Sequence, residues 1–379
     1  MENFIYYNPT SLHFGKGVVN RLGFIINGYG KKAMLVYGKG SVKNSGAYSD
    51  VITQLEKQNI EYIEYAGIKS NPIVEDIDKA ADLAKENNVD FIIGIGGGSV
   101  IDSAKIISVV AKSNNKAWDF ISYKAKPANS LPLIAVLTLA ATGTEMNNIA
   151  VAQSDELKVK GALVSAFIYP KHSFLDPSYT LTVPYNYTSY GIADVIAHSF
   201  EAYFGGGEAQ LSDKIVFSIV NEMIEIAPSL LNNLEDYELR ARMMYASTLA
   251  LNGLTSYGRI AGDWGVHSIG HCLSVLYDIP HGASLSIVYP AWLKMIKSVN
   301  PDRIKTISKA IFNEEDIDVF ISKLEDFYKS INSPVRLADV NIGTDKNEEI
   351  LSTLIKNGVG GSVYRFNQEQ LSNLVNLMN

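Results

Sequence analysis

The kind of periodicity in the sequence changes near residue 184, and this change constrains the fold more than any other feature. Before it, short apolar runs at 33–37, 89–95 and 131–137 alternate with segments of helical spacing. After it, long segments with apolar residues at helical spacing take over. Alternating strands and helices indicate a mainly parallel sheet covered by helices. We therefore predict an α/β Rossmann-like domain over residues 1–184 and an all-helical domain over residues 185–379.

Composition excludes several classes of protein. The chain has 379 residues with 47% hydrophobic and 19% charged residues, which is typical of a globular protein with a large core. Its formal net charge of −7 argues against a nucleic-acid partner. The single Cys272 excludes an internal disulfide framework and is consistent with a reducing compartment. Neither a signal-peptide pattern nor an apolar run long enough for a bilayer is found, so we expect a cytoplasmic protein with no membrane partner.

A glycine-rich turn follows the apolar run at 89–95. It reads Gly94-Ile-Gly-Gly-Gly-Ser-Val-Ile-Asp102 and leads into a helical segment. Consecutive glycines let backbone N–H groups approach an anion, and the start of the following helix favours negative charge. The pattern is not the G-x-G-x-x-G dinucleotide fingerprint, because its sixth position is Ser99. It is not a P-loop either, because no Gly-Lys-Ser/Thr follows. We interpret it as a phosphate-binding turn in preference to a turn that needs small residues only for packing.

A second loop follows the first apolar run, and its side chains bear on the choice of cofactor. It contains no acidic residue that could bind a free ribose 2′-hydroxyl. Lys39, Lys43 and the Ser41 hydroxyl are instead suited to a 2′-phosphate, with Gly38 and Gly40 allowing close approach. The alternative is a solvated basic loop. We expect NADP(H) in preference to NAD(H).

Four histidines and one aspartate in the second half form a candidate metal site. Asp194 and His198 are four residues apart on a predicted helix and so share one face. His267 and His271 have the same spacing, and His281 follows Pro280. One carboxylate with neutral imidazoles suits Fe²⁺ or Zn²⁺, whereas Mg²⁺ and Ca²⁺ prefer oxygen ligands alone. Spacing does not decide whether His267 or His271 is the ligand.

Several strings of residues resemble one known family. They are GGGSVIDSAK at 96–105, TLAATGTEMN at 138–147, DPSYT at 176–180, GIADVIAHSFEAY at 191–203 and HSIGHCLSVLYDIPHG at 267–282. Together they resemble the iron-containing, or group III, alcohol dehydrogenases. The loop YGKGSVKNSG at 37–46 is most similar to the NADPH-dependent butanol dehydrogenase branch of that family.

The resemblance implies a fold, a metal site and a cofactor site. The fold would be a Rossmann-like domain followed by a helical domain, as in dehydroquinate synthase. The metal, Fe²⁺ or Zn²⁺, would be held by Asp194, His198, His267 and His281. His271 would then be a proton-relay group beside the nicotinamide. Gly97, Gly98 and Ser99 would hold the pyrophosphate, and Asn71 would lie near the adenosine half. Asp102 would lie near the nicotinamide end and is a second catalytic candidate. The other residues that would line the cofactor are Thr138, Thr142, Asn147 and Lys160.

The expected activity is hydride transfer between NADP(H) and a small neutral alcohol or aldehyde such as butanol or butanal. A glycerol dehydrogenase-like polyol oxidoreductase and a dehydroquinate synthase-like lyase are the alternatives on the same fold. The lyase is disfavoured because residues 191–203 contain no Lys or Arg for a phosphorylated substrate. A non-catalytic nucleotide-binding protein is a further alternative, but no ligand position is vacant. By analogy of fold we expect a homodimer.

Overall fold

The computed structural model describes residues 1–379, which form two compact units. The α/β unit comprises residues 7–183 together with 233–248. The helical unit comprises residues 1–6, 184–232 and 249–379. The domain boundary at residue 184 stays a prediction. Two segments lie on the other side of it in the compact units: residues 1–6 belong to the helical unit, and residues 233–248 belong to the α/β unit.

The α/β unit is built on a six-stranded sheet in which every neighbouring pair of strands is parallel. Across the sheet the strands are β1 (Ser11–Phe14), β8 (His172–Leu175), β5 (Leu133–Leu137), β4 (Phe91–Gly96), β2 (Lys32–Tyr37) and β3 (Glu61–Tyr65). The predicted parallel sheet is confirmed. β1 and β8 complete one side of it, and β8 had not been predicted because it is only four residues long.

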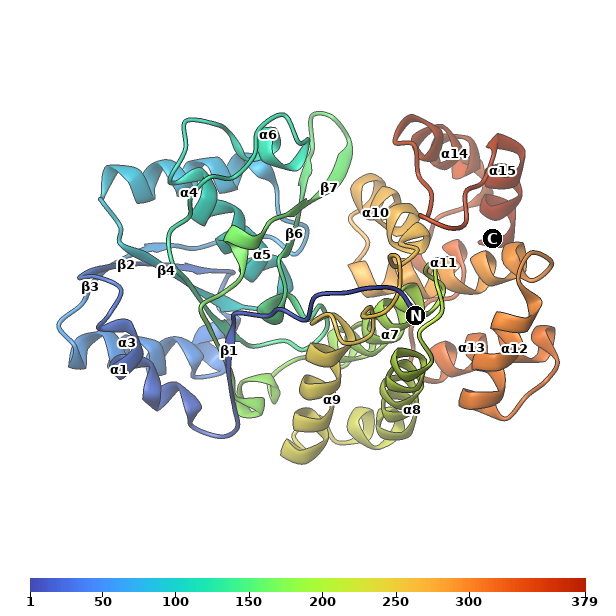
Figure 1. Ribbon diagram of the computed structural model, residues 1–379, viewed down its shortest axis with the longest axis horizontal. Coiled ribbons are helices and arrows are strands. Elements are labelled where there is room, and N and C mark those ends of the chain that lie inside the picture. Colours follow the sequence, from blue (N-terminus) through green and yellow to red (C-terminus); the bar gives the residue numbers. More distant parts are fainter. The chain divides into compact units, whose positions relative to one another are not determined.

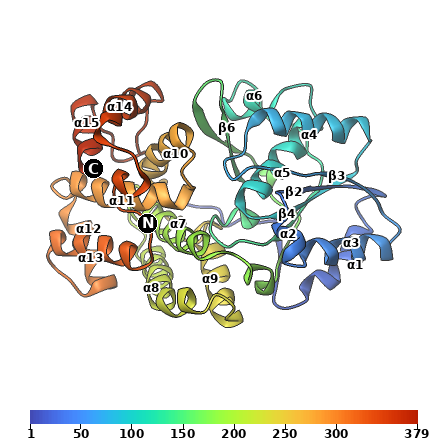
Figure 2. The same cartoon turned by 180° about the vertical axis from the view of Figure 1, so that it is seen from behind.

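Strand β2 shows why both faces of the sheet must be covered. Met34 and Val36 pack into one core, whereas Ala33, Leu35 and Tyr37 pack into the other. Because side chains alternate between faces along a strand, an uninterrupted apolar run needs helices on both sides. One side carries α4 (Val74–Glu86), α5 (Gly98–Val110) and α6 (Ala117–Ile121), and the other carries α1 (Leu22–Ile26), α2 (Ser41–Asn44) and α3 (Ala47–Lys57), as Figures 1 and 2 show.

A hairpin and one later helix complete this unit. The hairpin joins β6 (Ile149–Ser154) to β7 (Val159–Val164) in antiparallel register and packs on α5. Helix α9 (Tyr237–Ala250) joins the unit through its polar residues: the Thr248 hydroxyl donates to Glu145 (2.6 Å), and the Arg240 guanidinium donates to the Val183 carbonyl (3.0 Å). Short 3₁₀ turns connect these elements at Val18–Arg21, Thr144–Met146, Ala166–Ile168 and Pro177–Thr180.

The helical unit contains no strand, as its 3.6-residue periodicity predicts. Its helices are α7 (Tyr185–Tyr203), α8 (Gln210–Asn232), α10 (Gly265–Tyr277), α11 (His281–Ile296), α12 (Pro301–Phe312), α13 (Ile317–Ser330), α14 (Asn347–Lys356) and α15 (Gln368–Leu377). Short 3₁₀ turns lie at Leu337–Val340 and Thr344–Lys346. Helix α7 is buried along most of its length and packs against α11, which packs in turn on α10 (Figure 1). These three helices carry the predicted metal ligands.

A buried ion cluster fixes α8 within this unit. The Asp213 carboxylate accepts two hydrogen bonds from the Arg303 guanidinium, at 2.6 and 2.7 Å, and a third from Arg259. A carboxylate with this many charged donors remains ionised, and these donors lower its pKa even though burial raises it. By length and composition α8 could also cross a membrane, but one such helix is weak evidence because core helices pass the same test.

Candidate functional site

Helix α7 places Asp194 and His198 on one buried face, as their four-residue spacing predicts. The helix starts after Pro184, and small or apolar residues such as Ile192, Ala193 and Val195 let it run through the core. The Asp194 carboxylate and the His198 imidazole therefore project from a helix that is buried along most of its length.

Two further elements bring imidazoles to the same point. His267 lies in the first turn of α10, and His281 is the first residue of α11, directly after Pro280. The Oδ1 atom of Asp194 lies 3.6 Å from His198 Nδ1, 3.9 Å from His267 Nε2 and 3.7 Å from His281 Nε2. The rings of His198 and His267 are stacked, with centroids 4.7 Å apart. The ligand atoms of Asp194, His267 and His281 thus lie within 4.8 Å of one another, and His198 joins them through its contact with Asp194.

These distances fit a shared metal ion better than hydrogen bonds. At 3.6–3.9 Å the nitrogen–oxygen pairs are too long to be hydrogen bonds. Two ligands about 2.1 Å from one tetrahedral ion are about 3.4 Å apart, close to what is seen. The buried Nδ1 of His198 and Nε2 of His267 have no hydrogen-bond partner. Because buried polar atoms are normally satisfied, these residues fit a divalent cation such as Fe²⁺ or Zn²⁺.

Burial also sets the protonation state of His198. Desolvation and the neighbouring His267 lower the pKa of His198 well below its usual value. The ring is therefore neutral at pH 7, and neutral imidazole is the form that binds metals. His198 thus adds a neutral nitrogen donor to the Asp194 carboxylate.

Glu201 contacts one of the predicted ligands, and the sequence did not single it out. It lies seven residues after Asp194 on α7 and is fully buried. Its carboxylate lies 3.1 Å from His267 Nδ1, on the side of the ring opposite Nε2. Its place three residues after His198, on the same helix face, was the available signal. That spacing alone does not reveal which later residue it contacts.

His271 lies one helical turn beyond His267 on α10. Its ring centroid is 5.3 Å from that of His281 and 6.4 Å from that of His267. It is partly exposed, whereas His267 is buried. His267, and not His271, therefore shares the point where the ligand atoms of Asp194 and His281 meet. His271 thus lies beside two of the proposed ligands, and its proton-relay role stays a prediction.

In the α/β unit the glycine-rich turn joins β4 to α5, as predicted. A Cβ atom on Gly98 would lie 2.5 Å from the Thr142 side chain, and one on Gly96 would lie 2.6 Å from Val100. Both positions therefore require glycine for close packing. Gly97 is the N-cap of α5 and has no side chain to bond the first turn. The Ser99 hydroxyl donates to the Ser70 carbonyl, which ties the turn to the preceding loop.

Asp102 and Lys105 form a buried polar cluster behind this turn. The Asp102 carboxylate accepts from the Thr144 hydroxyl (2.5 Å) and from the Val151 N–H (3.0 Å). Lys105 Nζ lies 2.7–3.0 Å from four oxygen atoms, which belong to Thr144, Asn147 and Ile149. Burial lowers the pKa of Lys105 to about 7, although the Asp102 and Glu145 carboxylates raise it. Asp102 thus holds the 144–151 segment, and its catalytic role stays a prediction.

The other predicted cofactor residues lie around the same turn or along the hairpin. The Thr138 N–H donates to the Gly96 carbonyl (3.0 Å), so Thr138 extends from the strand beside the turn. The Asn147 amide is held between Lys105 and the Gly143 carbonyl (3.0 Å). Lys160 Nζ donates to the Asn71 side chain (2.9 Å), so these two predicted residues are in contact.

The loop after β2 has a feature that the sequence reasoning missed. Lys43 lies over the Tyr48 ring, with Nζ 4.8 Å from its centroid. The Tyr48 hydroxyl donates to Glu64 (2.6 Å), and the Tyr37 hydroxyl donates to the same carboxylate. Burial raises the pKa of Glu64, but the two hydroxyls and the Lys43 charge lower it overall. The loop itself contains no acidic residue, yet β3 places one beneath it.

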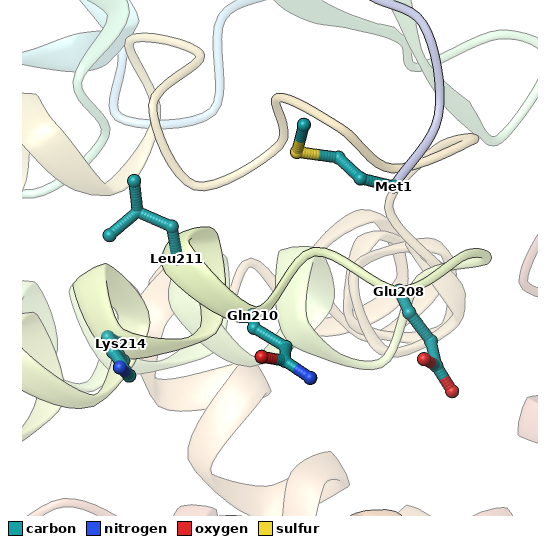
Figure 3. Close-up of a pocket in the computed structure, with 5 residues that line it drawn as sticks. All are labelled: Met1, Glu208, Gln210, Leu211 and Lys214. Atoms are coloured by element: carbon teal, nitrogen blue, oxygen red, sulfur yellow. The ribbon is translucent and has the colours of Figure 1, made fainter.

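A separate surface pocket of about 430 Å³ lies at the start of α8. It is lined by Met1, Glu208, Gln210, Leu211 and Lys214 (Figure 3). None of these residues belongs to either predicted site. The pocket is therefore no part of the candidate functional site.

Comparison with known proteins identifies the family. Residues 9–177 match the family model of the iron-containing alcohol dehydrogenases, and residues 188–378 match the C-terminal part of the Fe-containing alcohol dehydrogenase family. The chain belongs to the iron-containing alcohol dehydrogenase family. It is therefore an oxidoreductase, and the resemblance inferred from the motifs is confirmed.

Individual relatives cover almost the whole chain. A probable NADH-dependent butanol dehydrogenase 1 of Bacillus subtilis is 42% identical over 99% of both chains. The NADPH-dependent aldehyde reductase YqhD of Escherichia coli is 32% identical over 95% of this chain and 94% of its own. The crystal structure of an NADH-dependent butanol dehydrogenase A from Thermotoga maritima has a TM-score of 0.96 at 36% identity, covering 100% of this chain and 99% of that one. Both NADH- and NADPH-dependent proteins thus resemble this chain.

We expect Lys105→Met to destabilise the α/β unit. The substitution removes four hydrogen bonds and leaves the buried Asp102 and Glu145 carboxylates without their cation. Each buried acceptor that is left without a partner costs about 1–3 kcal/mol. Urea denaturation should show this loss as a lower unfolding midpoint. Lys112→Met, at an exposed position just after α5, should change the midpoint little, and equal effects of the two substitutions would contradict the assignment.

Proposed function

We propose that the protein reduces small neutral aldehydes to primary alcohols, and catalyses the reverse oxidation, with a divalent metal ion and a nicotinamide cofactor. The balanced reaction converts an aldehyde, NADPH and one proton into an alcohol and NADP⁺. The observation that carries the proposal is the convergence of three imidazole nitrogens on the Asp194 carboxylate. Membership of the alcohol dehydrogenase family and the butanol dehydrogenase and aldehyde reductase relatives support the reaction class.

The site residues divide the work of the reaction between them. A divalent cation in this site supplies Lewis-acid polarisation of the substrate oxygen, and the nicotinamide supplies the hydride. Asp194, His198, His267 and His281 hold the cation. His271 holds on a ring nitrogen the proton that the alcohol oxygen takes up, because an imidazole can both accept and donate a proton. The backbone of Gly97, Gly98 and Ser99 binds the pyrophosphate at the N-terminus of α5.

The surroundings of the ligands support an uncharged substrate. The Trp264 ring lies 5.3 Å from His267 and 6.3 Å from His198, measured between centroids. An aromatic ring beside the ligands favours an aliphatic chain over a charged group. A short aliphatic aldehyde such as butanal is therefore the substrate that we propose.

The first test is a coupled assay of protein loaded separately with Fe²⁺ and Zn²⁺. NADPH oxidation would be followed by absorbance against aldehydes of increasing chain length, with glycerol and a phosphorylated aldehyde as comparisons. We expect turnover of neutral aldehydes, loss of turnover on chelation, and its return with one metal ion. Undiminished turnover in metal-free protein would contradict the proposed function.

We expect His271→Ala to lower turnover about 100-fold or more while the metal content stays near that of the wild type. The reason is that loss of a general acid typically costs a factor of 10² to 10⁴. Metal content by mass spectrometry after dialysis separates this role from that of a ligand. If the variant lost its metal together with its activity, His271 would be a metal ligand, and this would contradict its role as a proton relay.

We further propose that NADP(H) is preferred over NAD(H), on the basis of Lys39, Ser41 and Lys43. The NADPH-dependent relative supports this preference, whereas the relatives named as NADH-dependent and the Glu64 carboxylate beneath the loop oppose it. The two cofactors differ by a phosphate of about two negative charges, so Lys43 is the residue that should distinguish them.

The test is Lys43→Ala. Because charge-assisted hydrogen bonds are worth about 1.5–3 kcal/mol, kcat/KM for NADPH should fall about tenfold or more while that for NADH changes little. Lys57→Ala, at the exposed end of α3, is the matched control. Equal losses for both cofactors, or a wild-type enzyme that uses NADH faster, would overturn the preference.

We also propose that the enzyme is a cytoplasmic homodimer. Phe4, Ile5 and Tyr6 expose large apolar side chains near the N-terminus, and such residues are enriched at interfaces between subunits. The one cysteine, Cys272, is buried and makes no disulfide, which supports a reducing environment.

A further inference from the structure

The carboxylate of Glu201 forms three hydrogen-bond contacts, all with residues at the start of α10. The Trp264 N–H donates to Oε2 (2.6 Å), and the His267 N–H donates to Oε1 (2.9 Å). The third contact joins Oε1 to His267 Nδ1 at 3.1 Å. Glu201 itself belongs to α7, which carries Asp194 and His198. One side chain therefore links the helix with two proposed ligands to the helix with a third.

The contact with His267 Nδ1 determines where the ring proton lies. The Glu201 carboxylate accepts from two backbone N–H groups, and accepting a third bond from this ring requires the hydrogen on Nδ1. A neutral ring with its hydrogen on Nδ1 has its lone pair on Nε2. Nε2 is buried, has no hydrogen-bond partner, and lies 3.9 Å from Asp194 Oδ1. The lone pair is thus on the atom that faces the other ligands.

The two backbone contacts fix the position of the ring as well as its proton. Trp264, the N-cap of α10, has a left-handed backbone with φ of 65° and does not cap the helix with its side chain. The first N–H groups of a helix need acceptors; Glu201 supplies one for His267, whereas Asp263 supplies one for Gly265. The Glu201 carboxylate therefore sets the start of α10 and the orientation of the imidazole in its first turn.

Charge balance gives Glu201 a further role. Asp194 and Glu201 are both buried carboxylates, and the histidine ligands contribute no charge when neutral. Buried charges are costly unless they are compensated. A divalent cation held by these ligands would offset negative charge on the buried carboxylates, of which Asp263 beside Glu201 is a third.

We propose that Glu201 is a positioning residue that selects the metal-binding tautomer of His267 and compensates the charge of the cation. This inference rests on the proposed function only in that the site holds a metal ion. Outer carboxylates of this kind typically change metal affinity 10- to 100-fold when they are removed.

The test uses Glu201→Gln, which keeps the shape of the side chain and removes its charge. Glutamine keeps only one acceptor oxygen and has no charge, so either His267 Nδ1–H or the Trp264 N–H loses its acceptor. We expect the Kd for Co²⁺ to rise 10- to 100-fold, with a changed visible spectrum of the bound ion. Glu325→Gln removes another buried carboxylate of the helical unit, one that bonds Lys294 and Arg336, and should leave both readouts unchanged.

Histidine tautomers in the metal-free wild type give an independent readout. Long-range ¹H–¹⁵N spectra should show hydrogen on Nδ1 of His267, with the signal assigned through its absence in His267→Asn. Hydrogen on Nε2, or wild-type Co²⁺ affinity and spectrum in Glu201→Gln, would overturn the role of Glu201. A wild type that binds no Co²⁺ would overturn the proposed function, whereas the tautomer measurement still tests Glu201 even if Glu201→Gln fails to fold.

Discussion

The convergence of three imidazoles on one buried carboxylate is the constraint on which the proposed chemistry depends. It requires α7, α10 and α11 to pack with their polar residues facing one point inside an apolar core. The apolar residues that surround these helices bury Asp194, His198 and His267, whereas His281 stays partly exposed. The imidazole nitrogens lie 3.6–3.9 Å from the Asp194 oxygen, which is too far for hydrogen bonds. Burying polar atoms without partners costs free energy unless an ion lies among them, and this is why we infer a metal site.

In the α/β unit the buried oxygen atoms behind the glycine-rich turn are satisfied by a lysine side chain. Glycines at the β4–α5 turn let the 138–147 segment approach closely, and the Lys105 ammonium then joins Thr144, Asn147 and Ile149 behind it. Asp102 and Asn147, which are predicted to line the cofactor, are therefore held by buried polar contacts, whereas Ser41 and Lys43 are exposed after β2. Such preorganisation is what a site for hydride transfer requires.

The sequence predicts those features of the protein that depend on local spacing. The parallel sheet, the glycine-rich turn, and the Asp194–His198 pair are of this kind, because periodicity and i, i+4 spacing determine them. The choice between His267 and His271 depends on how α10 packs, and spacing left it open. Glu201 was missed for the same reason, since its partners lie more than sixty residues later. The hairpin β6–β7 and the Glu64 carboxylate beneath the cofactor loop likewise depend on contacts between distant segments.

X-ray absorption spectroscopy of the zinc-loaded protein tests the central claim most directly. The account predicts a first shell of three imidazole nitrogens and one carboxylate oxygen at about 2.0–2.2 Å, with the multiple-scattering pattern of histidine rings. Fewer than three imidazoles, or a sulfur neighbour at about 2.3 Å from Cys272, would contradict it.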